Sequence, residues 1–320
     1  QLEYILALGQ QRHFGKAAEQ CNVTQPTLSA MIQKLEEELG TKIFERNRQP
    51  IGITPVGQQI IEQAREVLNQ ADRIKSLIEE ARQEVSGVFR LGILPTIAPY
   101  LLPRFFPTLE KKFPKLDIRV SEIKTSDIKQ ALLTGEIDAG ILANMPDFEE
   151  YAINHLFYEQ YYAYIAEEDA LFEKDKIRTT DLATSDQLWL LDEGHCFRDQ
   201  LVRFCQLKPA QNSQLTYRLG SMETFMRMVE SGRGVTFIPE LAVMQMSETQ
   251  KRLVRPFAVP VPTRQLIMMT NKNYIRHTLL NAIIKPMFSS SSSTSIYLFS
   301  FKTSFLNIVY AAIHSGHNLI

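Results

Sequence analysis

The feature that most constrains this chain is an unbroken heptad pattern between Val56 and Val85. Its apolar residues alternate spacings of four and three, at Ile60, Ala64, Val67, Ala71, Ile74, Ile78, Ala81 and Val85. This pattern predicts one long helix with a single apolar seam, which is typical of helices that pack in pairs. Docking on its own domain is the alternative, but the cap and stop signals of a shorter packed helix are missing. We therefore expect a coiled-coil linker helix over residues 55–86, between two dissimilar parts.

Residues 1–54 have the pattern of short helices followed by a hairpin. Helices are expected over residues 2–11 and 14–21, and a third begins after Thr24, a good N-cap, and ends before Gly40. One face of this third helix is predicted to be buried, through Leu28, Ile32, Leu35 and Leu39.

The opposite face of that helix is polar but uncharged. Gln25, Ser29 and Gln33 repeat on it every four residues. Amide and hydroxyl groups suit pairing with base edges in the major groove, whereas an ordinary solvated face would usually carry Glu and Lys. The pattern favours a recognition helix.

Two short strands, Lys42–Phe44 and Ile51–Thr54, are predicted around a turn at 47–50, with Arg46 and Arg48 at its tip. Arginines on a hairpin beside such a helix are placed to meet phosphates or the minor groove, although charged hairpin tips are also common without that role.

The run from Phe14 to Ser29 continues with Leu35-Glu36, Leu39-Gly40, Phe44-Glu45-Arg46 and Ile53-Thr54-Pro55-Val56-Gly57. Together these motifs resemble the winged helix-turn-helix of LysR-type regulators. Thr24 stands where that family usually has Ser, and Ala30 replaces its usual Arg. The resemblance implies a linker helix that dimerises two chains and binding to double-stranded DNA with dyad-related half-sites. The DNA-binding residues expected are Thr24, Gln25, Pro26, Thr27, Ser29, Gln33, Arg46 and Arg48.

Residues 87–287 alternate between strand and helix patterns. Strands over 88–94, 116–120 and 139–143, with helices over 99–113 and 126–134, predict a parallel α/β unit. A second set has strands at 161–165, 188–191, 215–217 and 235–238, with helices from about 197 and over 222–231. The chain then returns near 265–269, with a closing helix to Lys285. This organisation resembles the effector module of LysR-type regulators, which has two α/β lobes like those of periplasmic binding proteins.

The segment from Leu191 to Gln200, continuing to Phe204-Cys205, resembles the redox segment of the peroxide-sensing members of that family. The stretches 91–96 and 99–103, and Thr125, resemble the same members. Thiols react with peroxide as thiolates, and His195 and Arg198 can favour the anion of Cys196. Cys196 is thus the candidate peroxidatic residue and Cys205 the resolving one. Polar partners for peroxide would come, by resemblance, from Thr96, Thr125, His195 and Asp199.

The cysteine spacing has a geometric consequence. Cys196 and Cys205 are nine positions apart. If the segment between them is helical, this step rises about 13 Å, whereas a disulfide needs Cα atoms within about 7 Å. Oxidation would then force local refolding, which could rotate subunits and respace the DNA-binding heads. The competing interpretations are that these cysteines are inert, or that they bind metal with His195, although no further Cys or His cluster completes a tetrahedral site.

Bulk properties exclude several classes. The 320 residues are 44% hydrophobic and 22% charged, an ordinary globular composition, and the net charge of −1 does not by itself favour nucleic acid. No apolar run of about 18 residues and no secretory leader pattern is present, so we expect a cytoplasmic protein. Three cysteines do not make a disulfide framework. No cofactor or metal is expected, and the Ser-rich stretch 288–320 is expected to be poorly ordered.

The expected protein is therefore a regulator and not an enzyme. By resemblance it forms a homodimer or homotetramer, activates peroxide-defence genes through RNA polymerase and is reset by a thiol reductant. One alternative is a metabolite-responsive regulator with a small molecule between its lobes. A thiol peroxidase is a weaker alternative, because such an enzyme needs neither a winged helix-turn-helix nor a heptad linker.

Overall fold

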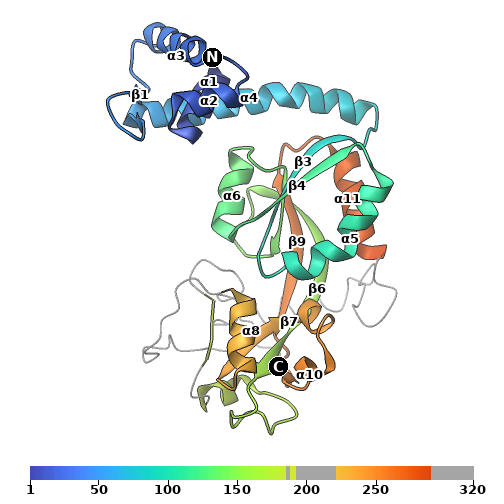
Figure 1. Cartoon of the computed structure of the whole chain (residues 1–320). Coiled ribbons are helices and arrows are strands. Elements are labelled where there is room, and N and C mark those ends of the chain that lie inside the picture. The colour runs from blue at the N-terminus through green and yellow to red at the C-terminus, as the bar shows by residue number, and fades with distance from the viewer. Residues whose placement is uncertain (185–187, 192–220, 290–320) are drawn as a thin grey trace, which may run out of the picture.

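The computed structural model describes residues 1–184, 188–191 and 221–289 (Figure 1). Its N-terminal unit comprises helices α1 (Leu2–Gln11), α2 (Phe14–Gln20) and α3 (Gln25–Glu38) and a hairpin of β1 (Phe44–Glu45) and β2 (Gly52–Ile53). Thr24 caps α3 as expected, since its Oγ1 accepts a hydrogen bond from the Thr27 amide. Leu28 and Ile32 are fully buried, but Leu39 is 49% exposed. The buried stripe therefore ends at Leu35, because the helix stops at Glu38 and Gly40 takes a left-handed backbone.

Helix α4 (Pro55–Ala81) leaves this unit as a single long rod. Thr54 caps its first turn by accepting from the Gly57 amide at 2.9 Å, and Pro55 opens the helix. The expectation that this helix lacks cap signals was therefore wrong. Farther along, the predicted seam is open to solvent in the single chain, with Val67, Ile74 and Ile78 about half exposed or more. These side chains have the spacing of a helix-pairing surface.

The helix ends earlier than its heptad pattern. Gln83 adopts a left-handed backbone, and the Glu84 and Gln83 amides donate to the carbonyls of Glu79 and Glu80. These are the two hydrogen bonds of a Schellman motif, which closes a helix. Val85 therefore lies outside α4, and it packs against the α/β core instead of extending the seam.

The first lobe is built on three parallel strands, as the alternation predicted. β3 (Gly87–Ile93) lies between β4 (Leu116–Glu122) and β5 (Ala139–Ala143). Helices α5 (Ala98–Lys112), α6 (Thr125–Leu133) and α11 (His277–Ser289) pack around them. The core is apolar, and Phe89, Leu91, Phe105 and Ile141 are fully buried.

The rest of the sheet is antiparallel, and the first ten residues of its longest strand were not predicted. The strand expected at 161–165 is the end of β6 (Tyr151–Ile165), which pairs with β9 (Thr263–Asn271) and β7 (Val235–Pro239). Asn154, His155 and Glu159 break the apolar pattern of its first part. The expected strand at 188–191 makes an isolated bridge from Leu188 to Val235. The helix expected from 197 and the strand at 215–217 lie outside the described residues.

The second lobe surrounds the far ends of β6 and β9 (Figure 1). It contains α8 (Met222–Glu230), the short helices α9 (Glu240–Val243) and α10 (Glu248–Lys251), β8 (Val254–Pro256) and the 3-10 helix η1 (Thr179–Thr184). α9, α10 and β8 were not predicted, since segments of three or four residues carry no readable periodicity. The sheet order is β4-β3-β5-β9-β6-β7, with β8 on β6, so β6 and β9 join the two lobes.

We predict that Gly57→Ala destabilises the N-terminal unit. A Cβ at this position would lie 2.2 Å from the Ile43 carbonyl oxygen, and backbone on both sides leaves little room to yield. The expected loss in unfolding free energy is about 1–3 kcal/mol, the usual range for overpacking. Thermal unfolding of the full chain measures it, with Gln58→Ala as the neighbouring exposed control. Equal stability of the two variants would contradict this account.

Candidate functional site

The predicted recognition helix presents its polar residues to solvent. Gln25, Thr27 and Gln33 are exposed, while Ser29 is half-buried. Thr24 and Thr27 join their hydroxyls at 2.8 Å, and Gln33 Nε2 donates to Glu37 Oε1 at 2.9 Å. Pro26 occupies the first turn, where a missing amide hydrogen costs nothing. The first turn and outer face of α3 are therefore free to meet a duplex.

Glu36 fastens the hairpin to this helix. Its carboxylate is 2% exposed, and it accepts hydrogen bonds from the Ile43 and Phe44 amides at 2.8 and 3.1 Å. Lys42 and Arg46 donate to its other oxygen, each at 3.3 Å. Burial alone would raise the pKa of Glu36, but the hydrogen bonds from the Ile43 and Phe44 amides and the bond and charge of Lys42 outweigh it and hold the pKa below its usual value.

The two predicted wing arginines differ in what they touch. Arg46 also donates to Ser29 Oγ at 3.2 Å and lies over the Phe14 ring, so it connects the hairpin to α2 and α3. Arg48 pairs with Glu45 at 2.8 Å, and its side chain is 73% exposed. Exposed ion pairs are weak, so Arg48 can exchange this partner for a phosphate at little cost.

Thr96 occupies the second region of interest, just after β3. It is buried, and Arg264 holds it from β9: Nη1 donates to Thr96 Oγ1 and Nη2 to its carbonyl, both at 3.1 Å. Glu159, the cross-strand partner of Arg264, accepts from Arg264 Nε at 2.6 Å. Its second oxygen accepts from the Leu241 amide at 3.3 Å. Thr96 therefore lies against a buried, neutralised ion pair.

Thr125 is the first residue of α6, just after β4. Its Oγ1 is buried and has no hydrogen-bond partner within the described part of the chain. Because β3 and β4 are adjacent parallel strands, Thr96 and Thr125 follow the same edge of the sheet. In open α/β sheets, ligands bind outside this carboxyl edge.

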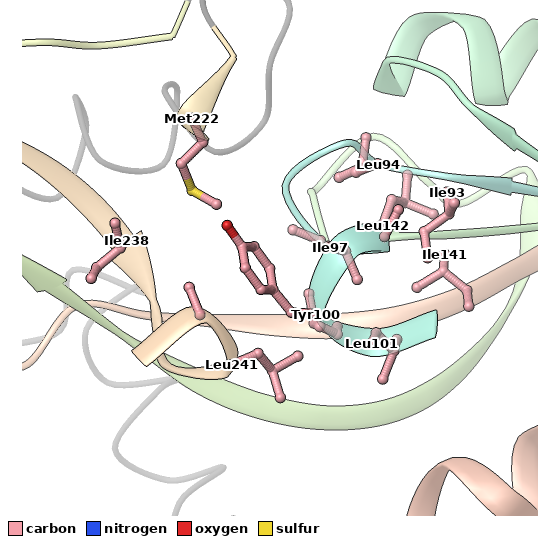
Figure 2. Close-up of a cluster of buried hydrophobic side chains, with 14 of the residues drawn as sticks. Ile93, Leu94, Ile97, Tyr100, Leu101, Ile141, Leu142, Met222, Ile238 and Leu241 are labelled. Atoms are coloured by element: carbon pink, nitrogen blue, oxygen red, sulfur yellow. The ribbon is translucent and has the colours of Figure 1, made fainter. Parts of the chain in front are cut away.

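Apolar side chains fill the junction of the lobes beside this edge (Figure 2). Tyr100 reaches from α5 toward Met222 of α8, and Leu241 and Ile238 close in from the second lobe; all four are buried. The first lobe contributes Ile97 and Leu101. At this point the lobes touch through their own side chains.

Several predicted residues cannot be placed. Cys196, Cys205, His195, Arg198 and Asp199 lie outside the described residues. Cys21 is half-buried against the core of the N-terminal unit, where burial and the nearby Glu3 carboxylate raise the pKa of its thiol. A thiol of this kind is poorly reactive.

The role of Glu36 as the anchor of the hairpin was not predicted from the sequence, and neither were the contacts of Arg264 and Glu159 with each other and with Thr96. A charged residue beside the buried stripe of α3 was the available signal for Glu36. Arg264 offered none, because its partners Thr96 and Glu159 lie 168 and 105 positions away.

Comparison with known families agrees with both halves of this architecture. Residues 1–58 match the bacterial regulatory helix-turn-helix protein of the lysR family, and residues 82–285 match the LysR substrate binding domain. The chain belongs to the LysR family of DNA-binding transcription regulators, which is not a family of enzymes.

No helix in the described ranges is long and apolar enough to cross a membrane.

Several similar proteins of this family have names that refer to hydrogen peroxide or to OxyR. A hydrogen peroxide-inducible genes activator of Pectobacterium carotovorum is 35% identical over 268 residues, covering 84% of this chain and 88% of the relative. OxyR of Escherichia coli K12, a DNA-binding transcriptional dual regulator, is 36% identical over 265 residues, covering 83% and 86%. A full-length OxyR variant from Pseudomonas aeruginosa has a TM-score of 0.71 at 35% identity, covering 89% and 96%. An OxyR mutant from Porphyromonas gingivalis is 48% identical with a TM-score of 0.60, covering 64% and 93%.

We predict that Glu36→Gln loosens the hairpin and makes stability less dependent on pH. Losing the charge weakens four hydrogen bonds, so unfolding free energy at neutral pH should fall by about 2–3 kcal/mol. The pKa of Glu36 in the folded protein lies below its ordinary value of 4.5. The charged carboxylate therefore contributes fully to the stability of the folded protein above pH 4.5. The contribution is lost as the pH falls through the lower folded pKa.

Thermal unfolding of the full chain between about pH 3 and pH 7 tests this, since the gap between wild type and variant should close at the acid end. Glu37→Gln, one residue away and exposed, is the control. A gap that is constant with pH would exclude the ionised carboxylate as its cause.

Proposed function

We propose that this chain is a DNA-binding transcription activator that senses hydrogen peroxide by oxidation of Cys196 and formation of a disulfide with Cys205. Hydrogen peroxide is the proposed effector because a relative described above is named a hydrogen peroxide-inducible genes activator. The structural observation that carries the proposal is the buried pair of threonine hydroxyls at one sheet edge, with Thr96 held by Arg264 and Thr125 Oγ1 without a partner among the described residues. Two small polar groups suit a ligand of two oxygen atoms.

The chemistry is balanced without a cofactor. The Cys196 thiolate attacks one peroxide oxygen, the O–O bond breaks and the departing hydroxide takes up a proton to leave as water. The Cys205 thiol then attacks the sulfenic sulfur, forming the disulfide and releasing a second water. Thr96, Thr125, His195 and Asp199 are the proposed polar partners of the peroxide, and Arg198 favours the thiolate.

Arg264 adds a feature that extends the sequence prediction. Both its Nη atoms donate to Thr96, so the Thr96 hydroxyl is left to donate its own hydrogen elsewhere. The Glu159 carboxylate fixes the guanidinium through Oε1, which contacts both Nε and Nη2. We propose that this pair orients Thr96 as a hydrogen-bond donor to peroxide.

The output is proposed to pass through the DNA-binding half. Thr24, Gln25, Pro26, Thr27, Ser29, Gln33, Arg46 and Arg48 contact double-stranded DNA with dyad-related half-sites. The open seam on α4 pairs two chains, and oxidation rearranges a dimer or tetramer so that the heads are respaced. RNA polymerase and a thiol reductant are the proposed further partners.

A metabolite-responsive regulator is less well supported. It needs room between the lobes, whereas Tyr100, Met222 and Leu241 are packed there. The described residues line one cavity of about 690 Å³ between α4 and the first lobe, and another of about 780 Å³ on the second lobe. Neither lies at the junction of the lobes.

We predict one intramolecular Cys196–Cys205 disulfide per chain after one equivalent of hydrogen peroxide, measured by peptide mapping. Cys196→Ser should abolish it, and Cys21→Ser should leave it unchanged because the Cys21 thiol is half-buried with a raised pKa. Finding free thiols at Cys196 and Cys205 in the treated wild type would contradict the disulfide switch. A DNA-binding response that persists in Cys196→Ser would favour a metabolite effector.

A further inference from the structure

A short, part-buried hydrogen bond crosses between the two lobes at the edge of their apolar junction. Tyr100 Oη, on α5 of the first lobe, donates to Glu223 Oε1, in the first turn of α8, at 2.6 Å. The Tyr100 residue is 6% exposed. Burial and the contact with Glu223 raise the pKa of Tyr100, so the phenol stays protonated and remains a donor. Glu223 itself is exposed, so the bond is only partly buried. O–H···O⁻ bonds of this length are about twice as strong as neutral ones.

The contact has support on both sides. The Tyr100 carbonyl accepts from Gln245 Nε2 at 2.9 Å, which adds a second bond from the first lobe to the second. Met222, next to Glu223, lies at the hydroxyl end of the Tyr100 ring (Figure 2). The first turn of α8 is therefore fastened to α5.

Trp189 lies just before the segment 192–220, which contains the two cysteines of the proposed switch, and α8 follows that segment. Its amide donates to the Val235 carbonyl at 2.8 Å, and its Nε1 donates to the Arg233 carbonyl at 2.9 Å. Its indole stacks on Phe225 of α8, with ring centroids 6.1 Å apart. The chain thus enters and leaves this segment at one helix, against Phe225 and at Glu223.

We infer that the Tyr100–Glu223 hydrogen bond is a strut between the lobes that opposes displacement of the first turn of α8. This inference rests on the proposed thiol switch, and it assigns a regulatory contact to that switch. The strut resists any displacement of the first turn of α8 that the pairing of Cys196 with Cys205 produces. The strut therefore sets how readily the disulfide forms, and it passes the movement of α8 to the first lobe through α5.

The test compares Tyr100→Phe and Glu223→Gln with a matched control. Tyr164→Phe removes a bond of the same kind on the same helix, since Tyr164 Oη contacts Glu230 Oε1 at 3.0 Å, but that bond stays within the second lobe. The probe is hydrogen peroxide at one equivalent on the full chain. Disulfide formation is followed by peptide mapping, and Trp189, the sole tryptophan of the sequence, reports on its surroundings by fluorescence.

Loss of the strut should speed disulfide formation by about tenfold in Tyr100→Phe and by less in Glu223→Gln, which keeps an acceptor. The Trp189 emission change should accelerate in parallel, and Tyr164→Phe should match wild type. A rate of disulfide formation in Tyr100→Phe within twofold of the wild-type rate would contradict the role of the strut. Equal acceleration of disulfide formation in Tyr164→Phe would contradict it as well.

A second measurement separates this inference from the proposed function. If wild type forms no disulfide, the proposed function fails, and amide hydrogen exchange in untreated protein still tests the strut. The amides of the first turns of α8 should then exchange faster in Tyr100→Phe and Glu223→Gln than in wild type and Tyr164→Phe. Equal exchange in all four proteins would reject it.

Discussion

The buried pair of Glu159 and Arg264 is the interaction on which the rest of the regulatory half depends. The two residues face each other across β6 and β9, the strands that both lobes share. Arg264 reaches Thr96 in the first lobe, and Glu159 accepts the Leu241 amide from the second. A buried charge without its partner costs several kcal/mol, so both lobes must meet the pair in one arrangement. The proposed sensing threonine is thereby positioned by the same contact that joins the lobes.

The N-terminal half repeats this use of one buried charge. Glu36 faces two amides and two cations, and through them it holds the hairpin against the recognition helix. Arg46 therefore stabilises the N-terminal unit in addition to its proposed contact with a phosphate. The Arg48 side chain, in contrast, is exposed and pairs with Glu45. Between the halves, α4 leaves its apolar seam in solvent, which is costly for a single chain and is relieved when two such helices pair.

Sequence patterns were most informative where structure is local. The cap at Thr24, the parallel strands of the first lobe and the ends of most helices follow from neighbouring residues, and they were placed to within a few positions. Errors arose where distant contacts override the pattern. Leu39 has the spacing of a core residue but lies beyond the end of its helix, and Val85 continues the heptads past a Schellman turn. The first ten residues of β6 looked irregular because Asn154, His155 and Glu159 interrupt the apolar pattern, and Glu159 finds its partners, Arg264 and the Leu241 amide, far away in sequence.

By itself, the sequence determined the class of protein: a recognition helix with its wing, a linker with one apolar seam, and two α/β lobes, all specified by periodicity and short motifs. It also brought Thr96 and Thr125 forward as candidate residues, through resemblance. Only the tertiary structure decided that Thr96 is held by Arg264 and Glu159, and that Tyr100 reaches Glu223, 123 positions away, across the junction of the lobes. The physical reason is that buried polar groups must find partners, and the fold alone determines which distant residue becomes the partner.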